Sequence, residues 1–395
     1  MLPGSFRRLW SPWTLASFVA CNGLPVYSEP LEAVARNLGP DAGYAEALCL
    51  DGGPGRYYFR SGHGSGASKF LIFFEGGSFC SSDLDCAERS GGYLGSTKND
   101  SATMTLDYPF FATAQTESPL MWNWNHVYVR YCDGGYYSGA RQQPKVVGAT
   151  TIFFRGAFIT EALFADLSAN SGLGDATDVV LSGCSAGAIR VFAHLDALRA
   201  LLPAKARVVG LPDSGFYLDL EMFTPLKRYV VVEQQATRLL NTACTQAFEG
   251  AEEKCLIGSV VSAYLQTPIF AVQSRFDTDQ RTCEMDESCA ASPACVNEYG
   301  ANLTAAIKQV FLKNKDRGVF LDSCSRHCSD GDCGQVQPLD DLGMTQLQAF
   351  AAWYVGGASE YGQSATFPCS TCCSGAGSAG NEYLFKLRAP MSIYM

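Results

Sequence analysis

Positive charge is scarce in this sequence. Lysine and arginine together number 29 against 39 aspartates and glutamates, which gives a formal net charge of −10. This balance argues against nucleic acid or an anionic membrane surface as a partner, because both attract basic proteins. Long hydrophobic runs are also missing, so no segment reaches the length that crosses a bilayer. Histidine is scarcer still, at four residues, and this small number later limits the choice of a catalytic base.

Cysteine, by contrast, is abundant. Seventeen cysteines in 395 residues are too many for a reduced cytosolic protein of this size and predict disulfides formed in an oxidising compartment. Apolar residues make up 47% of the chain, charged residues 17%, and glycine contributes 39 residues. These values are typical of a loop-rich globular enzyme with one large domain or two.

The N-terminus agrees with export from the cell. Arg7-Arg8 precede a short apolar run, residues 9–20, that has the pattern of a signal peptide. We expect a signal peptide over residues 1–23, a linker over 24–40 and a secreted protein, in the extracellular space or a cell wall. The sequons that begin at Asn99 and Asn302 permit N-glycosylation.

Strands and helices are expected to alternate along the chain. Apolar or β-branched runs predict strands at 56–60, 69–74, 125–131, 151–154, 179–181, 205–211, 268–273 and 318–322. Amphipathic or apolar helical patterns cover 156–169, 188–202, 303–313 and 344–354. Residues 45–50 are expected to pair with 56–60 as a hairpin. This alternation predicts an α/β fold with a mostly parallel sheet that helices cover on both faces.

One stretch carries the clearest chemistry. Residues 183–187, Gly-Cys-Ser-Ala-Gly, follow a predicted strand and precede a predicted helix. This context is typical of a nucleophile elbow, a sharp turn that exposes the hydroxyl of its central residue, Ser185. The N–H of Ala186 would point toward a developing oxyanion at the positive end of the helix. Cys184 is a rival nucleophile, but a buried or paired role suits it better because the turn displays its central residue.

Chain order selects the histidine. In α/β-hydrolases the nucleophile, the acid and the histidine follow one another in that order. His63 and His126 precede the elbow, and His194 lies on the elbow helix, directed away from the strand ends. Only His327 comes late enough, in a loop just past a predicted strand.

His327 also has an alternative interpretation as a metal ligand. Cys324, Cys328 and Cys333 lie close to it in the sequence. Their spacing does not match a paired Cys-x-x-Cys zinc site, and thiols in a secreted protein more often form disulfides. We therefore expect no metal and no other cofactor.

Two carboxylates compete for the role of the triad acid. Asp277 follows a late predicted strand and precedes the histidine, and Asp213 also ends a strand after the elbow. Chain order favours Asp277 without excluding Asp213. A glycine-rich loop, Gly76-Gly77-Ser78, follows the predicted strand at 69–74. Such a loop commonly supplies N–H donors for an oxyanion.

These motifs together resemble the pectin acetylesterases of plants and their animal relative, the Wnt deacylase Notum. The resemblance covers roughly residues 41–373. It rests on ordered blocks, which are Cys49-Leu-Asp-Gly-Gly, Phe74-Glu-Gly-Gly-Ser-Phe-Cys80, Trp122-Asn-Trp-Asn, Val129-Arg-Tyr-Cys-Asp-Gly134, Phe154-Arg-Gly156, Leu181-Ser-Gly-Cys-Ser-Ala-Gly187, Asp213-Ser-Gly-Phe-Tyr-Leu-Asp219, Thr267-Pro-Ile-Phe270, Phe276-Asp277 and Ser323-Cys-Ser-Arg-His-Cys328.

The resemblance implies a hydrolase domain over residues 41–373, followed by a C-terminal tail over 374–395. It implies a carboxylesterase whose catalytic residues are the nucleophile, acid and histidine Ser185, Asp277 and His327. It also implies an oxyanion hole formed by Gly77, Ser78 and Ala186. The family usually has a tryptophan beside the glycine loop where this chain has Ser78-Phe79.

Three functions are compatible with these residues. The first is the removal of O-acetyl groups from an acetylated polysaccharide such as pectin, although the acidic chain suits a long polyuronate poorly. The second is the removal of a fatty acyl group from a protein, which needs a deep apolar pocket that Phe79, Phe216 and Tyr217 could line. The third is an inactive, cysteine-rich binding protein of the same fold. The blocks are closer to those of the plant esterases, and the oligomeric state stays open.

Overall fold

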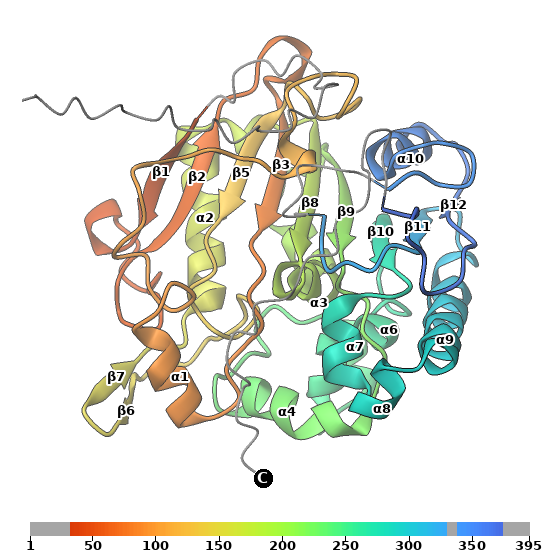
Figure 1. Ribbon diagram of the computed structural model, residues 1–395. Coiled ribbons are helices and arrows are strands. Elements are labelled where there is room, and N and C mark those ends of the chain that lie inside the picture. The colour runs from red at the N-terminus through yellow and green to blue at the C-terminus, as the bar shows by residue number, and fades with distance from the viewer. Residues whose placement is uncertain (1–31, 330–337, 374–395) are drawn as a thin grey trace, which may run out of the picture.

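A computed structural model describes residues 32–329 and 338–373 (Figure 1). The expected signal peptide and the C-terminal tail lie outside the described residues, as do Cys21 and Cys333. The strands are β1 Ala33–Leu38, β2 Gly55–Arg60, β3 Lys69–Phe74, β4 Thr103–Met104, β5 Asn125–Val129, β6 Lys145–Val147, β7 Thr150–Ile152, β8 Asp178–Cys184, β9 Arg207–Asp213, β10 Ile269–Ser274, β11 Arg317–Asp322 and β12 Glu360–Gly362. The helices are α1 Asp83–Ser90, α2 Gly156–Asn170, α3 Ala186–Ala200, α4 Thr224–Val232, α5 Thr242–Ala247, α6 Gly258–Val261, α7 Thr278–Glu284, α8 Glu287–Ala290, α9 Pro293–Phe311 and α10 Gln346–Tyr354.

One large sheet organises the described chain. Its strand order is β12-β11-β10-β9-β8-β3-β5-β2-β1-β4. The pairs from β12 to β5 are parallel, whereas β2, β1 and β4 add an antiparallel edge. This architecture confirms the predicted α/β fold with a mostly parallel sheet. In the described part of the chain, no helix is both long and apolar enough to cross a bilayer.

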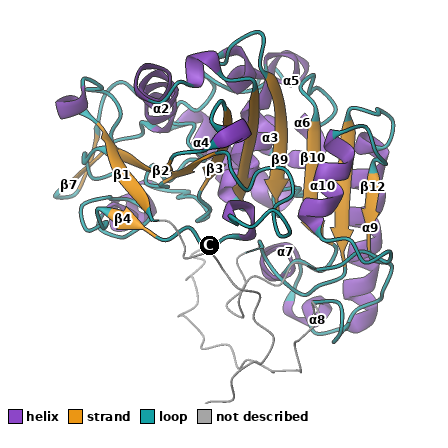
Figure 2. Ribbon diagram, turned by 90° about the horizontal axis from the view of Figure 1, so that it is seen from above, coloured by secondary structure: helices purple, strands orange, loops and turns teal. Residues whose placement is uncertain are grey.

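The central strands are buried on both faces, as their continuous apolar sequences predict. Along β3, Phe70, Ile72 and Phe74 face a core that contains residues of α2, α3 and α9. Leu71 and Phe73 face the opposite core, which α10 helps to form. Helices therefore lie on both sides of the sheet (Figure 2).

Three local predictions differ from the structure. Residues 33–38, expected in the linker, form β1, because their backbone groups pair with both β2 and β4. The predicted strand at 45–50 is wrong: it contributes only the isolated bridge between Leu48 and Pro54, since β1 already occupies that edge of β2. The strand near residue 151 pairs with β6 in a separate two-stranded ribbon, outside the main sheet.

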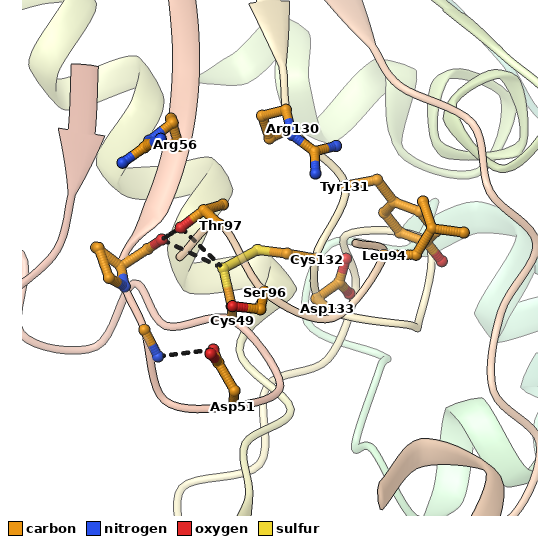
Figure 3. The surroundings of a disulfide bond; sticks show 12 residues. Cys49, Asp51, Arg56, Leu94, Ser96, Thr97, Arg130, Tyr131, Cys132 and Asp133 are labelled. Carbon is orange, nitrogen blue, oxygen red and sulfur yellow. Dashed lines mark hydrogen bonds between the residues drawn. A yellow bond between two sulfur atoms is a disulfide. The ribbon is translucent and has the colours of Figure 1, made fainter. Parts of the chain in front are cut away.

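Disulfides tie the loops to this frame. Within the described residues, seven disulfides join fourteen cysteines, and Cys283 is free. Cys49–Cys132 fastens the loop before β2 to the end of the β5 segment (Figure 3). Cys80–Cys86 closes the loop before and within α1, as their spacing indicated. The prediction that most cysteines are paired is confirmed.

The disulfide Cys184–Cys328 closes a sequence separation of 144 residues, whereas Cys289–Cys295 closes one of 6. Removal of a native disulfide typically costs about 2–5 kcal/mol, and in the chain-entropy model the cost grows with loop length. We expect Cys184→Ala/Cys328→Ala to lower the free energy of unfolding in urea by this amount, and the matched Cys289→Ala/Cys295→Ala pair to lower it less. Equal losses in the two double variants would contradict this expectation.

Candidate active site

Four polar side chains gather at the carboxyl ends of neighbouring strands. Ser185 follows β8, Asp213 ends β9, Asp277 follows β10, and His327 lies in the loop after β11. These strands are adjacent and parallel, so their carboxyl ends meet at one edge of the sheet. In open α/β sheets this edge is where ligands bind.

The elbow has the strained turn that its sequence predicts. Ser185 has φ 54° and ψ −118°, outside the regions that residues with a side chain normally occupy. It is half-buried, whereas its neighbours Cys184 and Ala186 are buried. A Cβ on Gly187 would lie 1.9 Å from the carbonyl oxygen of Phe74. Only glycine therefore allows the turn to sit this close to β3.

Asp277 and His327 contact each other directly. Nδ1 of His327 lies 2.9 Å from each carboxylate oxygen of Asp277. Asp277 is also the N-cap of α7, and its carboxylate accepts the backbone N–H groups of Asp279 and Gln280 at 2.9 and 3.1 Å. This fully buried carboxylate is held by two backbone donors and so fixes the orientation of the imidazole.

The surroundings of His327 alter its basicity. Burial on its own would lower the pKa of His327, because desolvation disfavours the charged ring. The hydrogen bond and the charge of Asp277 outweigh this effect and raise the pKa to about 9. The geometry thus joins His327 to a carboxylate that stabilises an imidazolium.

Asp213 has a different role. Its Oδ2 accepts the backbone N–H of Ser329 at 2.7 Å, and its Oδ1 accepts the hydroxyl of Ser214 at 3.1 Å. The Ser214 hydroxyl in turn accepts the N–H of Cys328 at 2.9 Å. Asp213 and Ser214 therefore anchor the backbone that follows the histidine, while Asp277 contacts the imidazole.

A disulfide joins the two halves of the site covalently. Cys184, directly before the serine, pairs with Cys328, directly after the histidine. The sulfurs of both residues and a ring nitrogen of His327 lie within 4.8 Å of one another. Because both sulfurs are in the disulfide, and Cys324 pairs with Cys373, these thiols are not available as zinc ligands. The prediction that Cys184 is buried or paired is confirmed.

The three other histidines have different surroundings. His63 is exposed and lies edge-on to Trp122. His126 is buried, and its Nε2 lies 2.8 Å from the carbonyl oxygen of Met121. His194 is buried within α3, and its Nε2 lies 3.0 Å from the hydroxyl of Ser138. His327 alone among the four lies at the carboxyl ends of the strands beside the elbow.

The glycine loop packs against the elbow. A Cβ on Gly76 would lie 3.1 Å from the Cβ of Ser185 and 2.8 Å from the carbonyl oxygen of Cys184. Gly77 and Ser78 both have positive φ, at 143° and 58°. Within residues 32–329 and 338–373, the N–H groups of Gly77, Ser78 and Ala186 donate to no protein acceptor. They therefore have no protein acceptor and can donate to a ligand.

Residues to which the sequence analysis assigned no individual role hold this loop in place. The hydroxyl of Tyr131 donates to the carbonyl oxygen of Ser78 at 2.7 Å, and Arg89 donates to that of Gly77. Glu75, directly before the loop, accepts the N–H of Tyr131 at 2.7 Å and pairs with the buried Arg130. These contacts hold the carbonyl groups of Gly77 and Ser78, whose N–H groups have no acceptor among the described residues.

The expected substrate contacts differ in their accessibility. Phe79 is partly exposed and packs against Tyr136, with ring centroids 4.9 Å apart. Phe216 is fully buried in the core and so presents no surface to a ligand. Tyr217 is partly exposed, and its hydroxyl donates at 2.8 Å to Asp279, two residues past Asp277. Phe79 and Tyr217 are the two of this set that a ligand can reach.

Comparisons with known proteins identify the family of this chain. The family described as Pectinacetylesterase matches residues 32–374. Pectin acetylesterase 7 of Arabidopsis thaliana is 31% identical over 356 residues, which cover 83% of this chain and 86% of that relative. The palmitoleoyl-protein carboxylesterase notum1a of Danio rerio is 30% identical over 253 residues, 60% of this chain and 49% of that relative.

Among solved structures, the Wnt deacylase Notum from Drosophila has the same fold. It matches with a TM-score of 0.71 at 24% identity and covers 87% of this chain and 99% of that chain. The family match extends over most of the chain, and the plant relative is aligned over most of its own length. The chain therefore belongs to the pectinacetylesterase family and is a carboxylic ester hydrolase.

Proposed function

We propose that this protein is a secreted serine esterase that removes O-acetyl groups from a polysaccharide, a pectin-like glycan. Ser185 is the nucleophile, His327 the general base and Asp277 the acid that orients it. The N–H groups of Gly77, Ser78 and Ala186 form the oxyanion hole. The observation that carries the proposal is the contact of His327 Nδ1 with Asp277 at 2.9 Å, in a loop tied by disulfide to the elbow.

The reaction follows from these positions. His327 accepts the proton of the Ser185 hydroxyl through Nε2, because Nδ1 is engaged by Asp277. The serine oxygen then attacks the acetyl carbonyl, and the three free N–H groups stabilise the oxyanion that forms. The bond between the acetyl carbon and the sugar oxygen then breaks, and His327 gives its proton to that oxygen, so that the sugar leaves with a free hydroxyl and the acetyl group stays on Ser185. A water molecule, deprotonated by the same histidine, releases acetate and restores the serine.

The choice of an acetylated polysaccharide rests on the relatives. The plant pectin acetylesterase aligns with 83% of this chain, against 60% for the animal palmitoleoyl-protein carboxylesterase. A fatty-acyl esterase is the second candidate, favoured by the Notum-like fold. An inactive binding protein is a weaker alternative, because the serine, the histidine–aspartate pair and the free N–H donors all lie at one edge of the sheet. Release of acetate from a panel of acetylated glycans distinguishes the first candidate from the other two.

Ser185→Ala should lower kcat for acetate release by several orders of magnitude without unfolding the protein, because the alanine has no nucleophilic oxygen. His327→Ala added to Ser185→Ala should cost little more, since the residues act as one unit. Turnover of acetylated pectin and of an aryl acetate by the single and double variants measures both effects. A folded Ser185→Ala variant with near wild-type turnover would rule this nucleophile out.

The pH dependence follows from the raised pKa of His327. A general base must be neutral to accept a proton, so kcat/KM should climb with pH through the pKa of about 9. Asp277→Asn removes the charge that raises this pKa. The inflexion of the curve of kcat/KM against pH should therefore move to a lower pH, toward or below the ordinary pKa of about 6.5. The same raised pKa stabilises the folded protein most below pH 6.5, and this contribution is lost as pH rises through about 9.

NMR titration of the His327 ring in Ser185→Ala, with and without Asp277→Asn, measures the shift directly. Asp213→Asn is the matched control, because Asp213 contacts the loop backbone and not the imidazole. An inflexion that moves more in Asp213→Asn than in Asp277→Asn would overturn the assignment of the acid.

Acyl length separates the two enzymatic candidates. Each additional buried CH₂ contributes about 0.8 kcal/mol only where apolar space receives it, and a long chain would otherwise have to displace packed side chains. We expect kcat/KM on aryl esters to fall steadily from acetate to octanoate. A preference for octanoate over acetate would assign the enzyme to the lipid-removing branch.

A further inference from the structure

A concave site lies beside residues that support the glycine loop. This cavity, of about 780 Å³, is named the Tyr93 groove after one of the residues that line it. Its lining includes Asp51, Glu88, Tyr93, Ser96, Lys98 and Asn99. None of the residues proposed for catalysis lines it. Its volume lies within the range that small-molecule sites occupy, roughly 300–1,000 Å³.

Tyr93 has the features of a fixed stacking platform. Tyr93 is 57% exposed, although its side chain is held at two points. The guanidinium of Arg130, which is fully buried, lies 3.7 Å from the ring centroid. The Tyr93 hydroxyl donates to Oε1 of Glu75 at 2.9 Å. One ring face is therefore backed by a buried cation while the ring keeps exposed surface, so little side-chain freedom remains to be lost on binding.

The rim supplies polar groups around this ring. The side chains of Asp51, Glu88, Lys98 and Asn99 are exposed. An aromatic face surrounded by hydroxyl, amide and charged groups suits a ligand with an apolar C–H face and a rim of hydroxyls. A pyranose ring has this amphipathic form.

The net charge of the rim determines whether a neutral or an acidic sugar can bind in the groove. Asp51 and Glu88 outnumber Lys98 on the exposed rim. Asp100 also lines the groove, but Arg130 pairs with it at 2.7 Å. A uronate carboxylate would meet net negative charge here and be repelled, whereas a neutral sugar would not.

The wall of the groove is also the support of the glycine loop. Tyr93 faces the groove and bonds Glu75, directly before Gly76. The next residue, Leu94, packs on the loop so closely that a Cβ on Gly77 would lie 2.6 Å from its Cδ2. A ligand in the groove is thus separated from the oxyanion loop by one layer of side chains.

We propose that the Tyr93 groove binds a neutral stretch of pyranose residues of the polysaccharide whose acetyl groups the enzyme removes. The identity of that polysaccharide rests on the proposed function, whereas the groove's preference for neutral pyranoses rests on its own residues. Tyr93 stacks on one sugar ring, and the polar rim binds the hydroxyls of its neighbours. The groove is therefore a specificity site beside the catalytic centre.

The test measures binding in the absence of turnover. Enzymatically deglycosylated Ser185→Ala protein is titrated with xylotetraose, mannotetraose, galactotetraose and trigalacturonate by calorimetry; deglycosylation matters because Asn99 belongs to a sequon at the rim. We expect at least one neutral tetrasaccharide to bind more tightly than trigalacturonate. In that background Tyr93→Ala should weaken binding at least tenfold, whereas Tyr93→Phe, which keeps the ring, should stay within threefold.

Three results would overturn the groove: no binding of any neutral tetrasaccharide, tighter binding of trigalacturonate, or unchanged affinity in Tyr93→Ala. If Tyr93→Ala does not fold, the variant Asn99→Arg replaces it in the test. This substitution at the exposed rim narrows the groove without touching the core. Unchanged affinity in Asn99→Arg would then overturn the proposal. Acetate release by the wild-type enzyme is assayed separately. If no acetate is released while a neutral tetrasaccharide still binds, the proposed function is rejected and the proposal for the Tyr93 groove stands.

Discussion

The parallel pairing of β8, β9, β10 and β11 is the constraint on which the site depends. Each strand ends at the same edge of the sheet, so residues up to about 140 positions apart along the chain become neighbours. The packing of both sheet faces holds these strands in register, because a one-residue shift would exchange the side chains that face the two cores. The positions of Ser185, Asp277 and His327 thus follow from packing that lies far from the chemistry.

A disulfide and several hydrogen bonds hold the loops that leave this edge of the sheet. Cys184–Cys328 joins the elbow to the histidine loop, and Asp213 with Ser214 binds the backbone of that loop. Asp277 combines two roles, since the carboxylate that caps α7 also orients the imidazole. Removal of these contacts would cost catalysis through lost geometry as well as lost stability, because misplacement of a catalytic group by about 1 Å can lower a rate by about 100-fold.

The fold and the elbow could be predicted from sequence because their signals are local. Periodicity located β3, β8, β9, β10 and β11, and glycines two residues either side of Ser185 marked the turn. Chain order did not decide whether Asp213 or Asp277 is the triad acid, since both end or follow strands. The contacts of their side chains distinguish the two, because only Asp277 contacts the imidazole. β1 was missed because its sequence has no clear alternation and its pairing with β2 is a long-range contact. The network of Glu75, Arg130 and Tyr93 was missed for the same reason: its members come from three separate segments.

The central claim is that Ser185 is an activated nucleophile served by His327. The most direct measurement is peptide mapping by mass spectrometry after treatment of the folded enzyme with a fluorophosphonate, which phosphonylates activated serines. The account predicts one stoichiometric adduct on the peptide that contains Ser185, and its loss in His327→Ala. An adduct on another serine, or equal labelling of Ser185 in His327→Ala, would contradict it.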